Sequence, residues 1–536
     1  LQVQQRLEEK YPPSHLPTVE QIQDMVEKVL IENGHSRTAK EYILYRAQRT
    51  RVREMNTALM KVYEDLTFKS AKDSDIKREN ANIDADTAMG TMLKYGSEGA
   101  KQFYEMYVLN PKHAKAHREG DIHIHDLDFL TLTTTCCQID IIKLFKDGFS
   151  TGHGFLREPN DIQSYSALAC IAIQSNQNDQ HGGQSIANFD YGLAPGVAKT
   201  YKKRYRSNLT SLIEVMDCAA HAKKTKEIFQ TLTAENLIPT LDGSQAYTDR
   251  EKTLLIEAGV PEEILDKIQS FSAKKATEET DKATYQAMEA LLHNLNTMHS
   301  RAGAQTPFSS INYGMDTSPE GRMVIRELLS ATIEGLGHGE VPVFPIQIFK
   351  VKEGVSWSEE DYAAAVKDFD KALAGEIKFK TPNFDLLIEA CRTTSVALFP
   401  NFMFLDAPFN RHEKWRIDDP DRFRYEVATM GCRTRVFENL HGEKSSWGRG
   451  NLSFTSMNLP RLAIEAMREA GDMIPDGNKH AIRKEAREIF LESVRKPATM
   501  MAEQLYERYC FQRTALARQF PFMMSNDVWK GGGRLQ

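Results

Sequence analysis

The chain has 536 residues with a formal net charge of −6, and hydrophobic residues make up 41% of it. This length exceeds the usual size of a single core, so we expect one large barrel or two to three domains. The acidic balance argues against a general nucleic-acid binder. The polar start LQVQQRLEEKYPP and the lack of an apolar run of about 18 residues predict no targeting segment and no membrane span. We therefore expect a soluble, cytoplasmic protein.

Residues 18–33 predict an amphipathic helix that begins with a capping-box pair, Thr18 and Gln21. A second helix is predicted from about residue 37 to residue 53. It carries several cations interleaved with tyrosines. This pattern is typical either of a solvated face or of a pocket where cations meet phosphates and a tyrosine packs on a base. The candidate contacts are Lys40, Tyr42, Arg46 and Arg49.

From about residue 55, helical stretches alternate with apolar strands and glycine turns, which is typical of an α/β barrel or an open parallel sheet. The predicted strands are 308–313, 343–348, 398–405 and 452–459, and the predicted helices between them include 281–299 and 320–334. Residues 241–285 are polar and charged, so we expect an irregular surface insertion. The segment 520–526 is apolar enough to be a buried strand. The glycine run after it and the start within a helical segment suggest that the natural protein continues at both ends.

Seven cysteines are scattered along the chain without a CxxC pair, which excludes a disulfide framework and a four-thiolate zinc site in this stretch. Cys170, Cys218 and Cys510 are expected to be small core residues. Cys432 is different, because it follows Met430 on a turn-rich loop between apolar segments. A thiol held on a tight loop away from water suits nucleophilic, redox or radical chemistry, and the flanking sequence must decide which.

Two polar segments are further candidates for a site, GDIHIHDLDF at 120–129 and SNQNDQHGGQSI at 175–186. In the first, His123 and its neighbours place His and carboxylate side chains at alternate positions, a pattern that suits a metal. We favour hydrogen bonds to backbone or substrate instead, because no third, distant ligand motif accompanies them. In the second, Gly182 and Gly183 let a ligand approach the backbone closely.

These segments resemble those of the anaerobic, class III ribonucleoside triphosphate reductases, which are glycyl radical enzymes. The similar blocks include HIHDLDF, TTTCCQID, NQNDQHGGQSI, HSRAGAQTPFSSINYG, MGCRTR and GRGNLSFTSMNLPRL, and they run in order from about residue 55 to Gln536. Residues 1–53 resemble the second half of an ATP-cone. The resemblance implies an α/β fold with a ten-stranded barrel over residues 54–536, preceded by a small helical remnant of this nucleotide-binding cone.

The resemblance also implies what individual residues do. Cys432 matches the cysteine whose sulfur radical removes the 3′ hydrogen of the ribose, and Met430 matches a residue beside it. Cys136 matches the cysteine that supplies hydrogen on the opposite face of the sugar, although the adjacent Cys137 leaves that choice to alignment alone. Asn451 matches the position near formate, the reductant of one subgroup. The implied substrate-binding residues are His123, Cys137, Gly182, Gly183 and Gln184.

The implied substrates are ribonucleoside triphosphates, with formate as co-substrate and with ATP and dATP as effectors at the cone. The family stores its radical on a glycine beside a zinc site of two cysteine pairs. Both are expected beyond Gln536, so no metal is expected within this chain. A radical S-adenosylmethionine enzyme is the implied activating partner, and the implied assembly is a homodimer or a higher oligomer.

Two alternatives stay open at this point. A glycyl radical enzyme of the formate-lyase type also uses adjacent cysteines, but that pair would lie on the buried loop itself. Here the pair Cys136 and Cys137 lies far upstream of Cys432. A non-catalytic regulator that binds nucleotides is the other alternative, because it would explain cone helices without a radical loop.

Overall fold

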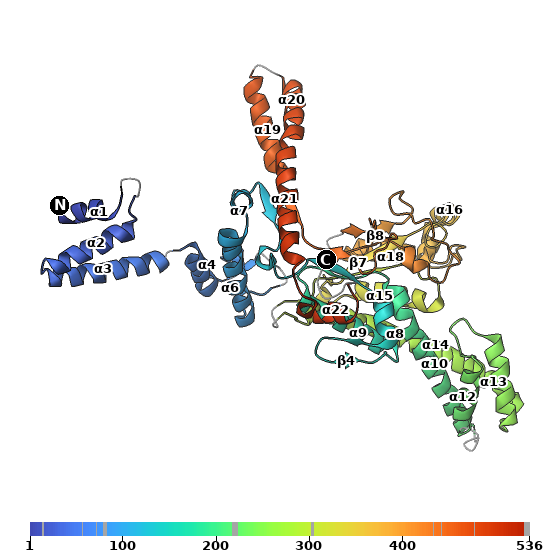
Figure 1. Cartoon of the computed structure of the whole chain (residues 1–536). Helices are drawn as coiled ribbons and strands as arrows, with labels where there is room; N and C mark the ends of the chain where they lie inside the picture. Colours follow the sequence, from blue (N-terminus) through green and yellow to red (C-terminus); the bar gives the residue numbers. More distant parts are fainter. Residues whose placement is uncertain are drawn as a thin grey trace. The chain divides into compact units, whose positions relative to one another are not determined.

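The structure is a computed structural model, and its division into parts can be followed in Figure 1. It consists of two compact units, Leu1–Gln102 and Phe103–Gln536. The domain boundary expected after residue 53 remains a prediction. The described residues are 1–12, 16–55, 57–70, 72–78, 83–216, 223–301, 305–431, 434–440, 442–475 and 478–529.

The first unit is helical, and its two predicted helices are confirmed. The capping box is present, because Gln21 N donates to Thr18 Oγ1 (3.2 Å) and Thr18 N donates to Gln21 Oε1 (2.8 Å). Met25 and Ala39 are buried where the two helices pack. The helices of this unit are α1 (Gln2–Lys10), α2 (Val19–Glu32), α3 (Ser36–Met55), α4 (Ala58–Phe68), α5 (Asp75–Arg78) and α6 (Ala88–Phe103).

A six-stranded sheet lies at the centre of the second unit, in the order β11-β2-β5-β6-β7-β8. The five strands from β2 to β8 run parallel, and β11 is antiparallel to β2. Most of their residues are buried, as is usual when parallel strands are covered on both faces. The strands are β2 (Cys136–Ile139), β5 (Gln184–Ile186), β6 (Ser309–Tyr313), β7 (Ile346–Val351), β8 (Asn401–Phe404) and β11 (Gly450–Asn451).

The predicted strands 308–313 and 398–405 are confirmed as β6 and β8. The strand predicted at 343–348 begins later, because Pro345 has no N–H to donate to a ladder. The prediction of one strand over 452–459 is wrong. Only Thr455–Met457 (β12) is a strand there, and it pairs with β1 (Ile122–Ile124) in a separate sheet. The chain leaves the central sheet after β11, and Leu452 O instead accepts hydrogen bonds from side chains.

Helices pack on one face of the central sheet around the main hydrophobic core, which includes Ile139, Ile186 and Ile311 of successive strands. Because side chains alternate along a strand, the residues between these point to the opposite face, here called the inner face. The helices on the core side are α8 (Ile141–Asp147), α9 (Ile162–Asp179), α10 (Phe189–Val215), α14 (Glu262–Thr297), α15 (Pro319–Glu334) and α18 (Phe384–Ala397).

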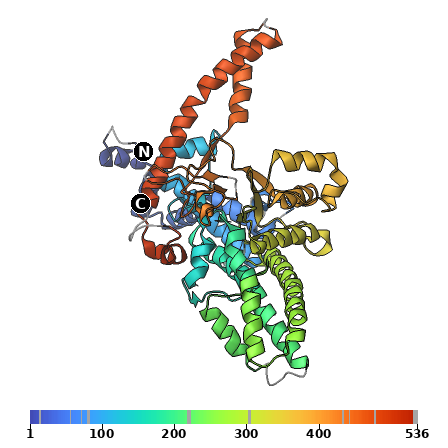
Figure 2. The same ribbon diagram turned by 90° about the vertical axis from the view of Figure 1, so that its right-hand side faces the viewer.

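The prediction of an irregular insertion over residues 241–285 is wrong, because this segment is helical. It forms α13 (Gln245–Glu257) and most of α14, and with α12 (Thr225–Ala234) and the end of α10 it makes a helical lobe (bottom of Figure 2). The lobe has its own hydrophobic core, which includes Leu265 and Ile268. Its buried positions also include Gln269, Ser272 and Thr280, so the apolar period in the sequence is diluted.

The apolar segment 520–526 is buried as expected, but the expected strand is wrong, because the segment forms α22 (Pro521–Ser525). Asp179 Oδ2 accepts hydrogen bonds from the first free N–H groups of this helix, Phe522 N (2.7 Å) and Met523 N (2.9 Å). Burial raises the pKa of Asp179 to about 6, against these two hydrogen bonds.

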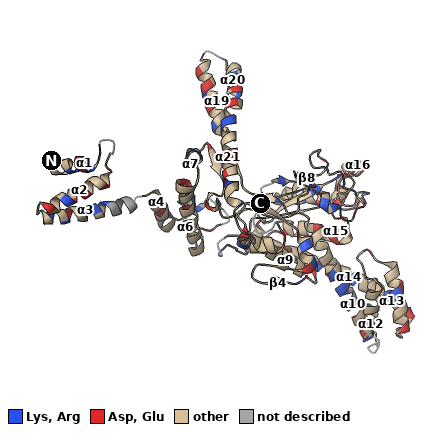
Figure 3. Cartoon of the chain, viewed as in Figure 1, with Lys and Arg blue, Asp and Glu red and all other residues tan. Residues whose placement is uncertain are grey.

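The other elements surround the sheet, and α19 and α20 project from it with acidic and basic side chains mixed along them (Figures 1 and 3). Within the described residues, no helix has the length and apolar character needed to cross a membrane. These elements are η1 (Tyr104–Val108), α7 (Pro111–Arg118), η2 (Leu127–Phe129), β3 (Phe149–Ser150), β4 (Phe155–Leu156), η3 (Gly337–Gly339), α16 (Glu359–Lys367), α17 (Phe369–Leu373), η4 (Arg422–Tyr425), β9 (Ala428–Thr429), β10 (Arg435–Val436), α19 (Leu459–Met473), α20 (Lys479–Ser493), α21 (Arg495–Gln512) and η5 (Ala517–Gln519).

Candidate active site

A tight hairpin, β9 and β10, carries the loop that contains Cys432 in the sequence. Met430 N donates to Thr434 O (3.0 Å), which closes the loop at its base, and Met430 is fully buried. Cys432 itself and Arg433 lie outside the described residues. The first end of the loop, Met430 and Gly431, is therefore buried, and Thr434 at the other end is partly exposed.

The hairpin lies on the inner face of the sheet, where polar side chains hold its backbone. Ser185 Oγ of β5 donates to Thr429 O (3.0 Å). Asn312 of β6 donates from Nδ2 to Thr429 O (2.9 Å) and accepts from Thr429 N at Oδ1 (3.0 Å). Both side chains are fully buried. A buried polar group destabilises a fold unless it is hydrogen-bonded. The hairpin backbone supplies hydrogen-bond partners for Ser185 and Asn312, and these side chains in turn hold the hairpin.

Cys136 begins β2, and Asn451 is its partner in the antiparallel pair with β11. Gly183 N donates to Cys136 Sγ (3.1 Å). A Cβ atom added to Gly183 would lie 3.7 Å from Cys136 Sγ and 3.7 Å from Gly431 N. The thiol of Cys136, the glycine segment and the start of the Cys432 loop therefore meet within the reach of one side chain.

Cys137 points the other way, into the main core. Asn176 Nδ2 of α9 donates to Cys137 Sγ (3.1 Å). Burial raises the pKa of the Cys137 thiol to about 12, which outweighs the opposite effect of the Asn176 hydrogen bond. The structure thus places the two adjacent cysteines on opposite faces of the sheet, with Cys136 beside the glycine segment and Cys137 among the core helices.

The two expected ligand glycines have different surroundings. A Cβ added to Gly182 would lie 2.3 Å from Thr135 O and 2.9 Å from Cys136 Sγ, so glycine is required there by the packing of β2. Gly183 has ordinary space around it. Gln184 folds back on this turn, since its Nε2 donates to Gly182 O (2.8 Å). Gln184 therefore shapes the turn that presents the Gly183 N–H to the Cys136 sulfur.

His123 lies on β1, opposite Ser456 of β12, and its side chain is exposed. Its ring centroid is 5.2 Å from that of His117 and 4.6 Å from that of His125. His125 Nε2 is hydrogen-bonded to Ser456 Oγ (2.7 Å), and burial and the nearby His123 lower the pKa of His125. Among the described residues, no three His, Cys, Asp or Glu side chains are grouped to hold a metal ion.

Asp126 connects this histidine segment with the glycine segment, because it is hydrogen-bonded to His181, the residue before Gly182. Burial raises the pKa of Asp126, but the hydrogen bond and charge of His181 and the charge of Arg508 outweigh burial, so the pKa lies below its usual value. His181 also stacks on Phe129 (ring centroids 4.2 Å apart). Two of the segments selected from the sequence are thus brought together.

Sequence reasoning missed a pair of buried charges, one of which lies just before the first strand of the hairpin. Lys350 Nζ of β7 lies 3.2 Å from Glu426 Oε2, and both side chains are at most 1% exposed. Lys350 also donates to Asn188 Oδ1 (2.5 Å), and Tyr191 OH donates to Glu426 Oε1 (3.2 Å). Burial raises the pKa of Glu426, while the Lys350 charge opposes that rise. A lysine inside the apolar run FPIQIFKV was the available signal for a paired, buried charge.

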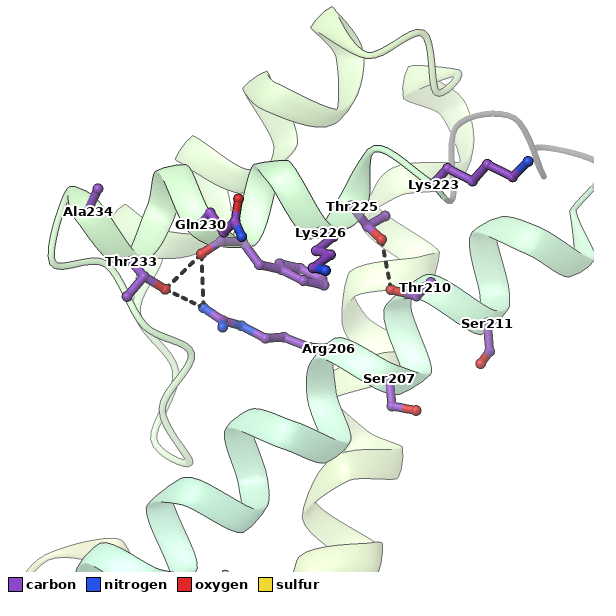
Figure 4. Close-up of a pocket in the computed structure, with 11 residues that line it drawn as sticks. Arg206, Ser207, Thr210, Ser211, Lys223, Thr225, Lys226, Gln230, Thr233 and Ala234 are labelled. Carbon is purple, nitrogen blue, oxygen red and sulfur yellow. Dashed lines mark hydrogen bonds between the residues drawn. The ribbon is translucent and has the colours of Figure 1, made fainter. Parts of the chain in front are cut away.

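An open pocket of about 970 Å³ between α10 and α12 was also missed (Figure 4). Arg206 crosses it, donates to Thr233 Oγ1 (2.9 Å) and lies over the Phe229 ring at 4.9 Å. Lys223 and Lys226 also line it, so its lining is basic. It belongs to the helical lobe and not to the sheet that carries Cys136.

In the first unit, the four predicted nucleotide contacts have different positions. Arg46 lies between α2 and α3, where it donates to Glu27 and to Asp24 (3.0 Å). These two carboxylates raise the pKa of Arg46, although burial acts in the opposite direction. Arg49 Nε donates to Tyr45 OH (2.9 Å). Lys40 is exposed, and the predicted base contact Tyr42 is partly exposed on the same helix.

Replacing Arg46 with alanine should weaken the packing of α2 on α3 by about 1 kcal/mol, because charge-assisted bonds that are partly exposed contribute modestly. Hydrogen exchange of residues 19–32 should become faster. Arg37→Ala is the matched control, since the Arg37 pair with Glu41 is 3.6 Å long and largely exposed. If Arg46→Ala weakens ATP binding without any change in exchange, Arg46 is a nucleotide contact and not a packing residue.

The fold and the site define a class: an α/β protein with a buried cysteine, Cys136, on the inner face of its central sheet and with an N-terminal helical unit. The anaerobic ribonucleoside-triphosphate reductase family matches residues 79–536, and the ATP cone domain matches residues 1–51. The chain therefore belongs to the anaerobic ribonucleoside-triphosphate reductase family.

Curated relatives carry the same family name. The chain is 26% identical to the anaerobic ribonucleoside-triphosphate reductases of Salmonella typhimurium and Escherichia coli over 453 residues, which are 84% of this chain and 51% of each relative. The enzyme of Enterobacteria phage T4 is 26% identical over 418 residues, 76% of this chain and 53% of the relative. The chain thus spans about half the length of the curated relatives it matches.

Solved structures of the Thermotoga maritima anaerobic ribonucleotide reductase are also similar. The complex with dATP and CTP has a TM-score of 0.40 and 10% identity, and the match covers 81% of this chain and 60% of that one. The structure with citrate in the active site has a TM-score of 0.38 and 12% identity, over 84% and 65% of the two chains.

Proposed function

We propose that this chain carries the catalytic site of an anaerobic ribonucleoside-triphosphate reductase, which converts NTPs into dNTPs in the cytoplasm. Membership of the family supports the proposal. The observation that carries it is the convergence of Cys136, Asn451 and the base of the Cys432 loop on one sheet face. Cys136 is about 300 residues before the other two segments in the sequence, and the proposed reaction needs all three at one sugar.

In the proposed mechanism, Cys432 is the residue whose sulfur radical takes the 3′ hydrogen atom of the ribose and later returns one. Cys136 supplies hydrogen from the other face as the 2′ hydroxyl leaves as water. Formate is the reductant, so the net reaction converts NTP, formate and a proton into dNTP, carbon dioxide and water. Asn451, on the strand beside Cys136, offers an amide donor to the formate carboxylate.

The buried position of Met430 supports this chemistry, because a sulfur radical must be shielded from water and from stray hydrogen donors. His123, which is exposed on β1, is the proposed side-chain contact with the substrate. Gly183 is the proposed backbone contact with it. Gly182, Gln184 and Cys137 hold the turn and the core around them. We also infer that the six strands of the central sheet belong to the ten-stranded barrel of the family.

The remaining parts of the proposal rest on the family. ATP and dATP are the proposed effectors at residues 1–51, with Lys40, Tyr42 and Arg49 as the contacts on α3. The stored radical would be supplied by a radical S-adenosylmethionine enzyme, and a zinc site of two cysteine pairs would accompany the glycine that holds it. The assembly is proposed to be a homodimer or larger.

The proposal is tested with full-length protein, activated anaerobically and assayed for dNTP formation from each NTP, with and without formate. Formation of dNTP only when formate is present supports it. Activated protein that holds a radical but forms no dNTP from any NTP would show that the proposed reaction is wrong.

Replacing Asn451 with alanine should raise the formate concentration needed for half-maximal turnover about tenfold or more, because one hydrogen bond to a charged group is lost (about 1.5–3 kcal/mol). The KM for the NTP should stay the same. Steady-state assays over a formate series measure both quantities. Full turnover of the wild-type protein with a dithiol reductant alone would remove formate from the proposal.

A further inference from the structure

The backbone of Thr429 is held from two sides. On one side it is paired with Arg435 across the hairpin. On the other side the carboxamide of Asn312 bonds both to its N–H and to its C=O, in the way that a neighbouring strand would. Ser185 Oγ adds a second donor to the same carbonyl oxygen. The central sheet thus contacts the hairpin through hydrogen bonds to the backbone of Thr429.

The Asn312 side chain is committed to this contact. Besides Thr429, its Nδ2 lies within hydrogen-bonding distance of Ile186 O (3.2 Å) and Ser185 Oγ (3.3 Å), so the carboxamide also ties β6 to β5. Asn312 and Ser185 lie on the inner face, while their neighbours Ile311 and Ile186 are in the core. An amide in a fully buried strand destabilises the fold unless its bonds are made, and here the hairpin supplies two of them.

The hairpin is also held at its other described points. Ala428 N donates to Ser446 Oγ (2.9 Å), and Ser446 Oγ donates to Val436 O (2.6 Å). Thr429 is three residues from Cys432, and an extended chain spans at most about 3.3–3.6 Å per residue. The position of Thr429 therefore limits where the loop can place its thiol relative to Cys136.

We propose that Asn312, assisted by Ser185, is a positioning residue that sets the place of the Cys432 loop over Cys136. The proposal rests on the proposed function, because the loop matters for catalysis only if Cys432 is the residue that reacts. Asn312 touches neither substrate nor sulfur in this role. It acts through the backbone of Thr429.

The test uses full-length protein with three variants. Asn312→Leu keeps the number and branching of the side-chain heavy atoms and removes all hydrogen bonds, and Ser185→Ala removes one hydroxyl. Ser309→Ala is the matched control, because Ser309 is a fully buried serine on the same strand as Asn312, and its hydroxyl is unpartnered among the described residues. Each variant is measured for kcat, for the KM of the NTP, and for hydrogen exchange at Thr429 and Met430.

In Asn312→Leu, kcat should fall about 100-fold, since a displacement of roughly 1 Å in a reacting group has an effect of that size. The KM should change less than twofold. In Ser185→Ala, kcat should fall about three- to tenfold, the effect of one neutral hydrogen bond. Exchange at Thr429 and Met430 should be faster in both variants, and Ser309→Ala should match the wild type in every measurement.

Unchanged kcat in Asn312→Leu, or exchange at Thr429 equal to that of Ser309→Ala, would overturn the proposal. So would a rise in KM with kcat intact, which would make Asn312 a substrate-binding residue. If Asn312→Leu does not fold, Ser185→Ala decides the matter by the same criteria. If the wild-type protein forms no dNTP, the proposed function fails, and the exchange data alone decide whether Asn312 and Ser185 hold the hairpin.

Discussion

Replacing Cys432 with serine should abolish dNTP formation and leave the fold and nucleotide binding intact. Serine is close to cysteine in volume, so the loop has no steric reason to rearrange. The O–H bond is stronger than the S–H bond, so an oxygen at this position cannot exchange a hydrogen atom with the sugar in both directions. The loss should be complete within the detection limit of a radiolabelled NTP assay, a fall of at least about 10⁴-fold, as for removal of other essential reacting groups.

The control for this variant is Cys391→Ser, because Cys391 is an exposed cysteine on α18. Its activity should match the wild type. Thermal unfolding and ATP binding of both variants should also match the wild type. Any dNTP formation by activated Cys432→Ser above the background of unactivated protein would show that another residue carries the radical.

Replacing Cys136 with alanine should abolish dNTP formation without reducing the radical signal that follows activation. Cys136 acts after the first hydrogen transfer in the proposed mechanism, so storage of the radical does not need it. Electron paramagnetic resonance of the activated protein and the NTP assay, run on one sample, separate the two steps. A weak radical signal in Cys136→Ala would place this residue in radical storage instead.

The adjacent Cys137 should behave differently. Its thiol lies in the main core with its pKa raised to about 12 by burial, so it stays protonated at neutral pH. Cys137→Ala should keep most of the activity and lower the free energy of unfolding by about 1–2 kcal/mol, the effect of a small loss of volume in a core. Normal turnover in Cys136→Ala together with none in Cys137→Ala would reverse the assignment.

The sequence allowed the segments of the candidate site to be selected, because short motifs with several glycines and polar residues are recognisable in it. It did not allow the choice between Cys136 and Cys137. Two adjacent residues on a buried strand look alike in sequence, and their faces are distinguished by contacts in the fold, Gly183 with Cys136 and Asn176 with Cys137. Asn312 was hidden for a related reason. A single asparagine within FSSINY does not stand out in the sequence. The hairpin residue that it contacts, Thr429, is 117 residues further along the chain.

The errors in the fold have physical causes of the same kind. Residues 241–285 were expected to be irregular because their apolar period is weak, but tertiary packing around Leu265 and Ile268 stabilises the helices. Gly182 was expected to admit a ligand, and the close approach of Thr135 O already requires a glycine there. A glycine reveals that something lies close to the backbone. It does not reveal whether that neighbour is a ligand or the protein itself.

The antiparallel pair of β2 and β11 has a consequence for synthesis on the ribosome. Thr135 and Leu452, which are bonded beside this pair, are 317 residues apart in the chain. At about 5–20 residues per second, Cys136 leaves the ribosome roughly 15–60 s before Asn451 is made. During that time β2 has no antiparallel neighbour, and for most of it the Cys432 loop has not been synthesised. A nascent chain therefore cannot bring Cys136, Asn451 and the Cys432 loop together until residue 451 has been synthesised.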